Sequence, residues 1–178
     1  SDRVSDAERQ LLTQIFRFFT QSDIEVGDNY LKRYIPLFQP LEIQMMMAAF
    51  SNMETVHIDA YALLLKTLGM PQAEFEAFRS YGDMRAKADY MHSFGTGTVA
   101  DVARTLAMFG AFTEGMALFA SFAMLLNFPR HNKMNGLGQI VSWSVRDESL
   151  HCAGVIRPFH AWHRETGAVT ATGHDALP

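Results

Sequence analysis

The sequence predicts an all-α protein: one domain over residues 1–165, built as a bundle of long helices, with an irregular tail at 166–178. Three observations support this fold class. Apolar residues recur at helical spacing through most of the chain, and no stretch alternates in polarity for long enough to form a sheet. Hydrophobic residues make up 48% of the 178 residues and charged residues only 19%, against a usual charged share of about 25%. The chain therefore carries enough apolar material for one large core.

Five helical segments account for most of the length, at about 5–34, 41–68, 72–91, 99–126, and from 138 onward. The first begins with a capping box, because Ser5 is followed three residues later by Glu8. Gly69 and Pro71 end the second helix. A Gly/Thr stretch separates the third helix from the fourth. In the fifth, Pro158 is expected to kink or end the helix, because proline removes a backbone hydrogen bond.

Charge and composition exclude several classes of protein. The net charge is −4 and no Lys/Arg stripe or block is present, so we expect no nucleic-acid partner. The only cysteine, Cys152, cannot form an internal disulfide, and the first residues are polar, which favours a cytoplasmic location. Residues 109–128 are apolar enough for a membrane span, but Glu114 lies among them. We therefore expect a helix buried in protein, and no membrane association.

Each long helix carries at least one charged or polar side chain inside its apolar stripe. On the second helix the stripe steps by three and four residues, so its members share one face: Ile43, Met47, Phe50, Glu54, His57, Tyr61, Leu64 and Leu68. On the first helix Asp23 continues the apolar series, whereas Glu25 points about 200° away from it in projection. Asp23 is therefore expected to point inward and Glu25 outward. Glu114 interrupts the stripe of the fourth helix, and Glu148 and His151 that of the fifth.

These positions form two matching halves, each with one carboxylate followed by Glu-x-x-His. Asp23 precedes Glu54 and His57, and Glu114 precedes Glu148 and His151. The spacing alone is a weak signal, but burial strengthens it. Uncompensated charges in a bundle interior would each cost several kcal/mol, so they must be paired, protonated or bound to metal. The pattern is that of ferritin-like dimetal proteins, in which the metal pair lies between four long helices.

The donor set also indicates which metals would bind. Carboxylate oxygens with one imidazole per ion suit Fe(II) or Mn(II), and the lack of cysteine ligands argues against a structural zinc site. Tyr61 follows His57 by four residues on the same face, so an oxidised metal pair could take an electron from its phenol. The alternative is a core tyrosine whose hydroxyl binds a nearby group.

At these residues the chain resembles the radical-generating small (beta) subunit of class I ribonucleotide reductase. The resemblance covers nearly the whole chain. It is carried by the ligand spacings and by the segments S-N-M-E-T-V-H-I-D-A-Y, F-T-E-G-M-A-L-F-A-S-F and G-Q-I-V-S-W-S-V-R-D-E-S-L-H. It implies that two Fe ions, or Mn or a mixed Mn/Fe pair, are bound by Asp23, Glu54, His57, Glu114, Glu148 and His151.

The resemblance also implies an activity and partners. The metal pair would activate O₂ and generate a radical on Tyr61, which passes to a large catalytic subunit that reduces ribonucleotides to deoxyribonucleotides. Asp147 would be a partner of His57 on the radical-transfer route, which agrees with the rule that carboxylates orient metal-bound histidines. The walls of the radical pocket would be Leu118, Phe122 and Val141. The small subunit is expected to be a homodimer.

The chain departs from that family in length and at two positions. Family members are longer, and their N-terminal relay tryptophan and C-terminal docking tail have no counterpart here, so we expect the catalytic core of a longer protein. Leu118 stands where an aromatic residue is frequent, and Ser144 where an aliphatic residue is common. Both positions bear on radical lifetime and metal preference.

Two other functions stay open on the sequence. One is a ferritin-like oxidase that acts on its own small or lipid substrate, for which we expect a pocket open to solvent and no stable tyrosyl radical. The other is a non-catalytic metal-binding bundle, for which we expect uncoupled metals and many surface carboxylates.

Overall fold

The computed structural model describes residues 4–70 and 82–167. Within these ranges every regular element is a helix and no strand occurs, which confirms the predicted all-α class. The label η marks π-helical segments, in which each turn holds an extra residue. In chain order the elements are α1 (Asp6–Asn29), η1 (Tyr30–Tyr34), α2 (Leu41–Thr67), α4 (Gly82–His92), α5 (Val99–Ala107), η3 (Met108–Ala117), α6 (Leu118–Arg130) and α7 (Asn135–Thr166).

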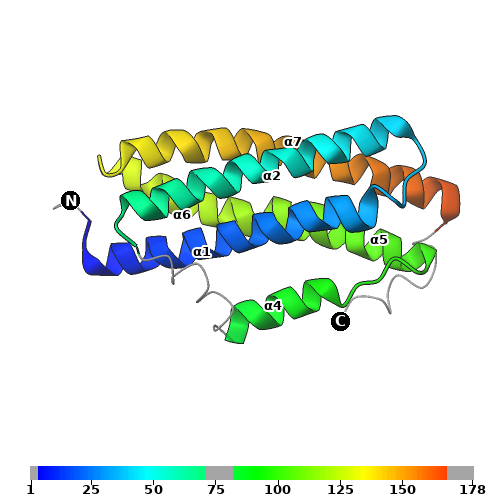
Figure 1. The fold of residues 1–178 in the computed structure, drawn as a ribbon, viewed down its shortest axis with the longest axis horizontal. Helices are drawn as coiled ribbons and strands as arrows, with labels where there is room; N and C mark the ends of the chain where they lie inside the picture. Colours follow the sequence, from blue (N-terminus) through cyan, green and yellow to red (C-terminus); the bar gives the residue numbers. More distant parts are fainter. Residues whose placement is uncertain (1–3, 71–81, 168–178) are drawn as a thin grey trace.

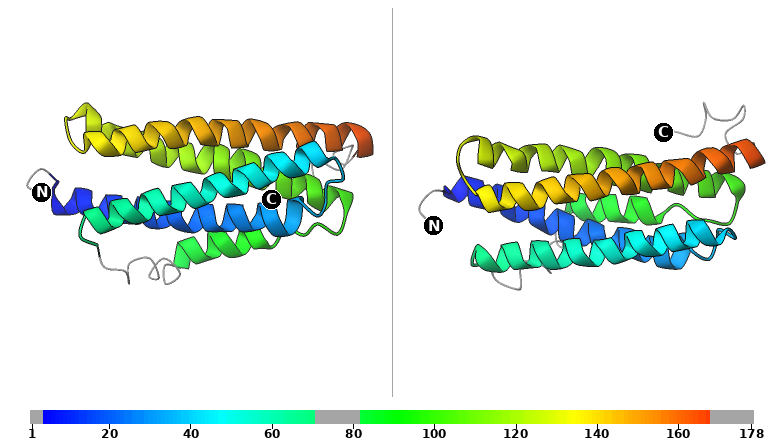
Figure 2. Two further views of the ribbon diagram at one scale, coloured as in Figure 1. Left: turned by 45° about the horizontal axis from the view of Figure 1, so that its top comes forward. Right: turned by 90° about the horizontal axis from the view of Figure 1, so that it is seen from above.

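The long helices form two antiparallel pairs (Figures 1 and 2). In the first pair α1, extended by η1, runs against α2. In the second pair α5, η3 and α6 form one continuous rod that runs against α7. Contacts between α2 and α7, and between α1 and α6, close the two pairs into a bundle. The shorter α4 lies on the outside of the bundle beside α1 (Figure 1), where His92 contacts Glu25.

The start of α1 confirms the predicted capping box. Ser5 Oγ accepts a hydrogen bond from the Glu8 backbone N–H, 3.3 Å away, and the Glu8 carboxylate accepts one from the Ser5 N–H at 2.8 Å. These bonds satisfy two backbone donors that a helix N-terminus otherwise leaves unpaired. The second helix also begins and ends close to the expected positions, with Pro40 before its first residue and Gly69 in a left-handed conformation after its end.

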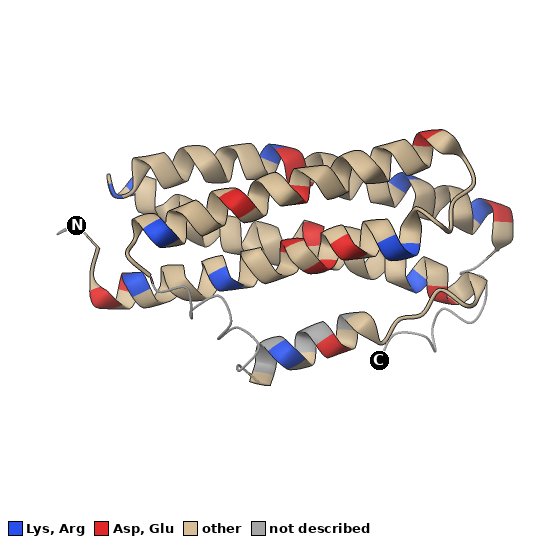
Figure 3. Ribbon diagram, in the orientation of Figure 1, with Lys and Arg blue, Asp and Glu red and all other residues tan. Residues whose placement is uncertain are grey.

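Two apolar clusters fill the bundle. One contains Phe16, Phe19, Tyr61, Phe122 and Val141, and the other contains Tyr30, Phe50, Phe109 and Val155, each with further members. On every long helix the charged stripe positions lie between the residues of one cluster and those of the other. Figure 3 shows acidic residues midway along the bundle helices. The bundle therefore holds one polar layer between two apolar ones.

Three predicted boundaries are wrong or incomplete. The fourth helix ends at Arg130 and not at 126, because Pro129 lies in the last turn and its ring packs against Gly138, which has no Cβ to collide with it. The fifth begins at Asn135 and continues through Pro158 to Thr166. Packing beyond the proline supports this end, since Trp162 Nε1 donates a 3.0 Å hydrogen bond to the Val99 carbonyl.

Part of the prediction falls outside the described residues. Of the third expected helix, 72–91, the structure describes 82 onward as α4. Of the expected tail, Thr166 is the last residue of α7, and residues 168–178 lie outside the described ranges. Neither π-helical segment was predicted.

Close packing between η3 and α7 gives a stability test. A Cβ added at Gly110 would lie 2.9 Å from Val155 Cβ and 2.7 Å from its Cγ1. Because a Cβ is fixed to the backbone, Gly110→Ala must push the helices apart, and we expect it to lower the free energy of unfolding by about 1–3 kcal/mol. Urea denaturation followed by circular dichroism measures this.

The matched control is Gly136→Ala in α7, where an added Cβ meets nothing within 4 Å. This variant should be as stable as the wild type or more stable by up to about 1 kcal/mol, since alanine favours helix. Equal stability of the two variants would show that η3 and α7 are less closely packed than described.

Candidate metal centre

The six side chains predicted as metal ligands are buried and come from all four arms of the bundle. Asp23 lies on α1, Glu54 and His57 on α2, Glu114 on η3, and Glu148 and His151 on α7. Their exposed fractions range from 0 to 5%. Asp23 is 2% exposed, whereas Glu25 faces outward and contacts His92, as the stripe analysis predicts.

These side chains form two groups that share one residue. The first group is Glu54, Glu114, Glu148 and His151, and the second is Asp23, Glu54 and His57. Within each group one ligand atom per residue lies within 4.8 Å of the others. Glu54 belongs to both groups. Each group contains one histidine, which is the arrangement expected for two neighbouring ions.

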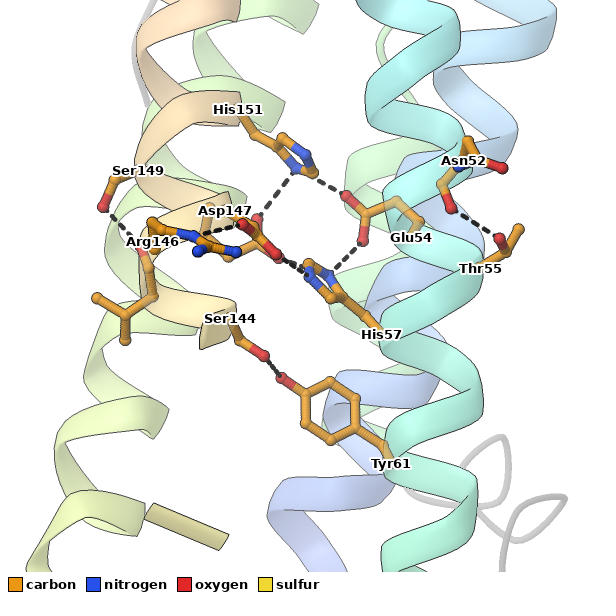
Figure 4. Close-up of polar contacts among 12 residues, drawn as sticks. Asn52, Glu54, Thr55, His57, Tyr61, Ser144, Arg146, Asp147, Ser149 and His151 are labelled. Carbon is orange, nitrogen blue, oxygen red and sulfur yellow. Dashed lines mark hydrogen bonds and ion pairs between the residues drawn. The ribbon is translucent and has the colours of Figure 1, made fainter. Parts of the chain in front are cut away.

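Two carboxylates reach both imidazoles (Figure 4). Glu54 places Oε1 2.9 Å from His151 Nδ1 and Oε2 3.3 Å from His57 Nδ1. Glu148 places Oε1 3.1 Å from His57 Nδ1 and Oε2 3.4 Å from His151 Nδ1. Each carboxylate therefore spans the space between the two histidines with one oxygen toward each. This is the geometry of bridging ligands.

Several polar atoms of the cluster are buried without a hydrogen-bond partner. They are Asp23 Oδ2, Glu54 Oε1, Glu114 Oε2, Glu148 Oε2, and both ring nitrogens of His151. Buried polar atoms are almost always paired, so such a concentration needs an explanation. Glu54 Oε1 and His151 Nδ1 are 2.9 Å apart and form an ion pair, but their geometry is not that of a directed hydrogen bond. A buried set of oxygen and imidazole nitrogen atoms with so few directed hydrogen bonds is suited to binding cations, and these donor types suit Fe(II) or Mn(II).

Three carboxylates of the cluster have shifted pKa values, and the direction of the shift differs among them. Burial, together with the charge of Glu54, holds the pKa of Asp23 well above its usual range. Burial and the charge of Glu148 do the same to the pKa of Glu114. For Glu148, burial is outweighed by His151 and His57, so its pKa lies below the usual range.

The two histidines are held in their charged form. Burial opposes an imidazolium, but the adjacent Glu148 and Glu54 carboxylates outweigh it and raise the pKa of His57 to about 11. The same two carboxylates raise the pKa of His151 to about 10. Without metal, two imidazolium ions therefore supply the positive charge that the carboxylates require.

Asp147 lies at the outer nitrogen of His57. Its Oδ2 is 3.5 Å from His57 Nε2, and its Oδ1 accepts a 3.1 Å hydrogen bond from Arg146 Nε (Figure 4). The Asp147 side chain is 19% exposed, so it connects the buried imidazole to the surface. Carboxylates in this position orient a metal-bound histidine.

Tyr61 lies beside the His57 side of the cluster. Its ring centroid is 6.4 Å from that of His57 and 4.9 Å from that of Phe19. The hydroxyl donates a 2.7 Å hydrogen bond to Ser144 Oγ (Figure 4). The three predicted wall residues, Leu118, Phe122 and Val141, belong to the same buried cluster as Tyr61. Ser144, noted in the sequence as an unusual polar residue, is the hydrogen-bond partner of the phenol.

Sequence reasoning missed a second tyrosine at the centre. Tyr30 donates a 2.6 Å hydrogen bond from its hydroxyl to Glu114 Oε1. The available signal was spacing: Tyr30 follows Asp23 by seven residues on the first helix and so lies about 20° from it in projection. That periodicity places Tyr30 inside the bundle, but it cannot show which side chain on another helix lies opposite.

Comparison with known proteins identifies the family of the chain. A family model described as ribonucleotide reductase, small chain, matches residues 1–172. The probable ribonucleoside-diphosphate reductase small subunit of Invertebrate iridescent virus 6 is 46% identical over 178 residues, which cover 92% of this chain and 49% of the relative. The beta subunit from Chlamydia pneumoniae is 26% identical over 165 residues, covering 85% of this chain and 47% of the relative.

A solved structure is similar in fold. A crystal structure described as a putative class I ribonucleotide reductase from Bacillus halodurans superposes with a TM-score of 0.86 at 18% identity, covering 96% of this chain and 63% of that one. The chain spans about half the length of the viral and bacterial relatives that it matches. Since the family model covers residues 1–172, the chain belongs to the ribonucleotide reductase small-chain family.

Proposed function

We propose that this chain is the dimetal core of a ribonucleotide reductase small subunit, in which Tyr61 holds a radical that is passed to a large catalytic subunit. The observation that carries the proposal is the pair of carboxylates, Glu54 and Glu148, that each reach both buried imidazoles. A pair of iron or manganese ions, or one of each, would supply O₂-dependent oxidation at this position. Membership in the small-chain family supports the same function.

The ligand roles follow from the two groups. Glu54 and Glu148 would be the ligands shared by the two ions, because each directs one oxygen toward each histidine. Asp23 and Glu114 would each bind one ion, one in each group, and His57 and His151 would each provide one nitrogen. Together the four carboxylates match the charge of two divalent ions. The interior then carries little net charge, which removes the cost of burying the carboxylates.

The surroundings of Tyr61 suit a radical that must persist. The phenol is 2% exposed and packs among aromatic rings, so water and reductants are excluded from it. Burial and the charge of Asp23 hold its pKa well above the usual range, so the phenol keeps its proton until it is oxidised. Ser144 Oγ accepts the hydrogen bond of the phenol and so fixes the orientation of its O–H.

Radical export follows the outer side of the centre. His57 Nε2 faces Asp147, whose partly exposed carboxylate also accepts a hydrogen bond from Arg146. This line of side chains leads from the buried site to the surface, where a large catalytic subunit would receive the radical.

The wider assignment rests on the family. We expect a homodimer that works with the large subunit in the cytoplasm, where the free Cys152 would stay reduced. Residues 1–165 would form the metal-binding domain. Burial of all six ligand side chains, at 0 to 5% exposure, favours this function over an oxidase with a substrate pocket open to solvent.

Metal binding should stabilise the fold. Under anaerobic conditions, Fe(II) or Mn(II) at 100 times its Kd should add about 2.7 kcal/mol. For a chain of this size that corresponds to a Tm increase of about 5–10 °C. Differential scanning calorimetry with and without metal measures the shift.

A matched pair of variants on α2 provides the control: Glu54→Gln should abolish the increase in Tm, and Asp59→Asn, at an exposed position, should retain it. A Tm that does not change in saturating metal would contradict a buried dimetal site.

Metal uptake should release protons. At pH 7 the imidazoles of His57 and His151 are protonated, since their pKa values are about 11 and about 10. Metal binds neutral imidazole, so ions and protons compete. Raising the pH from 6 to 8 should therefore tighten binding by about tenfold per pH unit for each proton released. Isothermal titration at three pH values in buffers of different ionisation enthalpy gives both affinity and proton count. A pH-independent affinity would contradict the assignment of these histidines as ligands.

Tyr61→Phe should remove the radical and preserve the centre. The ring can still pack against Phe19, and only the hydrogen bond to Ser144 is lost, at a cost of about 1 kcal/mol. After anaerobic Fe(II) loading and exposure to O₂, the wild type should show a tyrosyl EPR signal and Tyr61→Phe should not. Tyr34→Phe is the matched control, because Tyr34 is equally buried but bonds Thr105. A tyrosyl signal that survives in Tyr61→Phe would assign the radical to another residue.

A further inference from the structure

Tyr30 is a buried phenol that the proposed function does not use. It is 1% exposed, and its hydroxyl donates a 2.6 Å hydrogen bond to Glu114 Oε1 across 84 residues of sequence. Its ring lies edge-on to His151, with 6.3 Å between centroids, and 5.8 Å from Phe50. Tyr30 therefore contacts two of the four residues in the Glu54, Glu114, Glu148 and His151 group.

The hydrogen bond makes the two oxygens of Glu114 different. Oε1 is occupied by the Tyr30 hydroxyl, whereas Oε2 is buried and has no hydrogen-bond partner. A carboxylate with two free oxygens can chelate one ion or bridge two. When a donor holds one oxygen, the other is left to bind as a single ligand atom, and carboxylate ligands in metal sites commonly carry such a donor.

We propose that Tyr30 is a positioning residue of the metal centre, which holds Glu114 Oε1 so that Glu114 binds its ion through Oε2 alone. The inference rests on the proposed dimetal site and adds a residue to it. It gives the two buried tyrosines different roles. Tyr30, on the His151 side, donates its hydrogen bond to a proposed ligand, whereas Tyr61, on the His57 side, donates to Ser144.

The backbone supports this role at both ends of the bond. Tyr30 is the first residue of η1, and Glu114 lies within η3. A π-helical turn rotates the residues that follow it relative to a regular helix, and such turns are frequent at functional sites. Here the departure from α-helix occurs at the two places that bring a phenol and a carboxylate from different helical pairs into contact.

Tyr34 provides a matched control for Tyr30. Both tyrosines lie in η1, both are 1% exposed, and their ring centroids are 6.1 Å apart. The Tyr34 hydroxyl, however, lies 3.0 Å from the Thr105 carbonyl and 3.0 Å from Thr105 Oγ1, and so is paired away from the ligand groups. If Tyr30 only fills space, the two Tyr→Phe variants should behave alike.

The test compares Co(II) binding by the wild type, Tyr30→Phe and Tyr34→Phe. Equilibrium dialysis measures the affinity, and visible absorption reports the coordination of the bound Co(II). Removing a hydrogen-bond partner of a ligand typically weakens metal binding by about 10–100-fold. We therefore expect Tyr30→Phe, but not Tyr34→Phe, to lose that much Co(II) affinity at one of the two metal sites. Its Co(II) absorption should also weaken, because Glu114 can then chelate and raise the coordination number. Tyr34→Phe should keep wild-type affinity and spectrum. Circular dichroism of the metal-free proteins checks that each variant is folded.

A double-mutant cycle shows whether Tyr30 acts through Glu114. In a Glu114→Gln background, Tyr30→Phe should cause no further loss of affinity. Wild-type Co(II) affinity and an unchanged spectrum in Tyr30→Phe would overturn the positioning role. An equal loss of affinity in Tyr34→Phe would also overturn it. So would a full further loss when Tyr30→Phe is added to Glu114→Gln. A wild type that binds no Co(II) would instead refute the dimetal site itself.

Discussion

The bundle is organised around the need to compensate charge in its interior. Four carboxylates and two imidazoles form a layer between two apolar clusters, and every long helix contributes to it. Two of the carboxylates are paired with an imidazole on another helix, Glu54 with His151 and Glu148 with His57. Sliding one helix by a turn would leave charges facing hydrocarbon at a cost of several kcal/mol each. The polar layer therefore sets the register in which the helices pack.

The burial of the charged cluster could be predicted because helical periodicity indicates which face of a helix points inward. Asp23 continues an apolar stripe and is buried, whereas Glu25, two residues later, faces outward. The same reasoning placed Glu114 and the two Glu-x-x-His pairs in the interior. The all-α class followed from the same pattern, as did the capping box at Ser5, since both depend on residues close together in sequence.

The features that escaped prediction depend on residues far apart in sequence or on shifts in helical period. Tyr30 and Glu114 are 84 residues apart, and no local pattern shows that their side chains meet. A π-helical turn changes the period by one residue, and the stripe of the first helix continues through η1 without a visible break. The fourth helix continues past 126 and the fifth does not end at Pro158, and both extensions have partners distant in sequence: Pro129 packs against Gly138, and Trp162 bonds the Val99 carbonyl.

The division of the proposed ligands between the two helical pairs affects how the protein would open with metal bound. Asp23, Glu54 and His57 belong to the first pair, and Glu114, Glu148 and His151 to the second. An ion bound by Glu54, Glu114, Glu148 and His151 would connect the two pairs, because Glu54 comes from the first pair and the other three residues from the second. Proteins commonly unfold in parts, and here the expected partial unfolding is the separation of the two helical pairs. While such an ion is bound, the two helical pairs would separate only after the ion dissociates. Amide hydrogen exchange and proteolysis between the pairs would therefore be limited by metal dissociation.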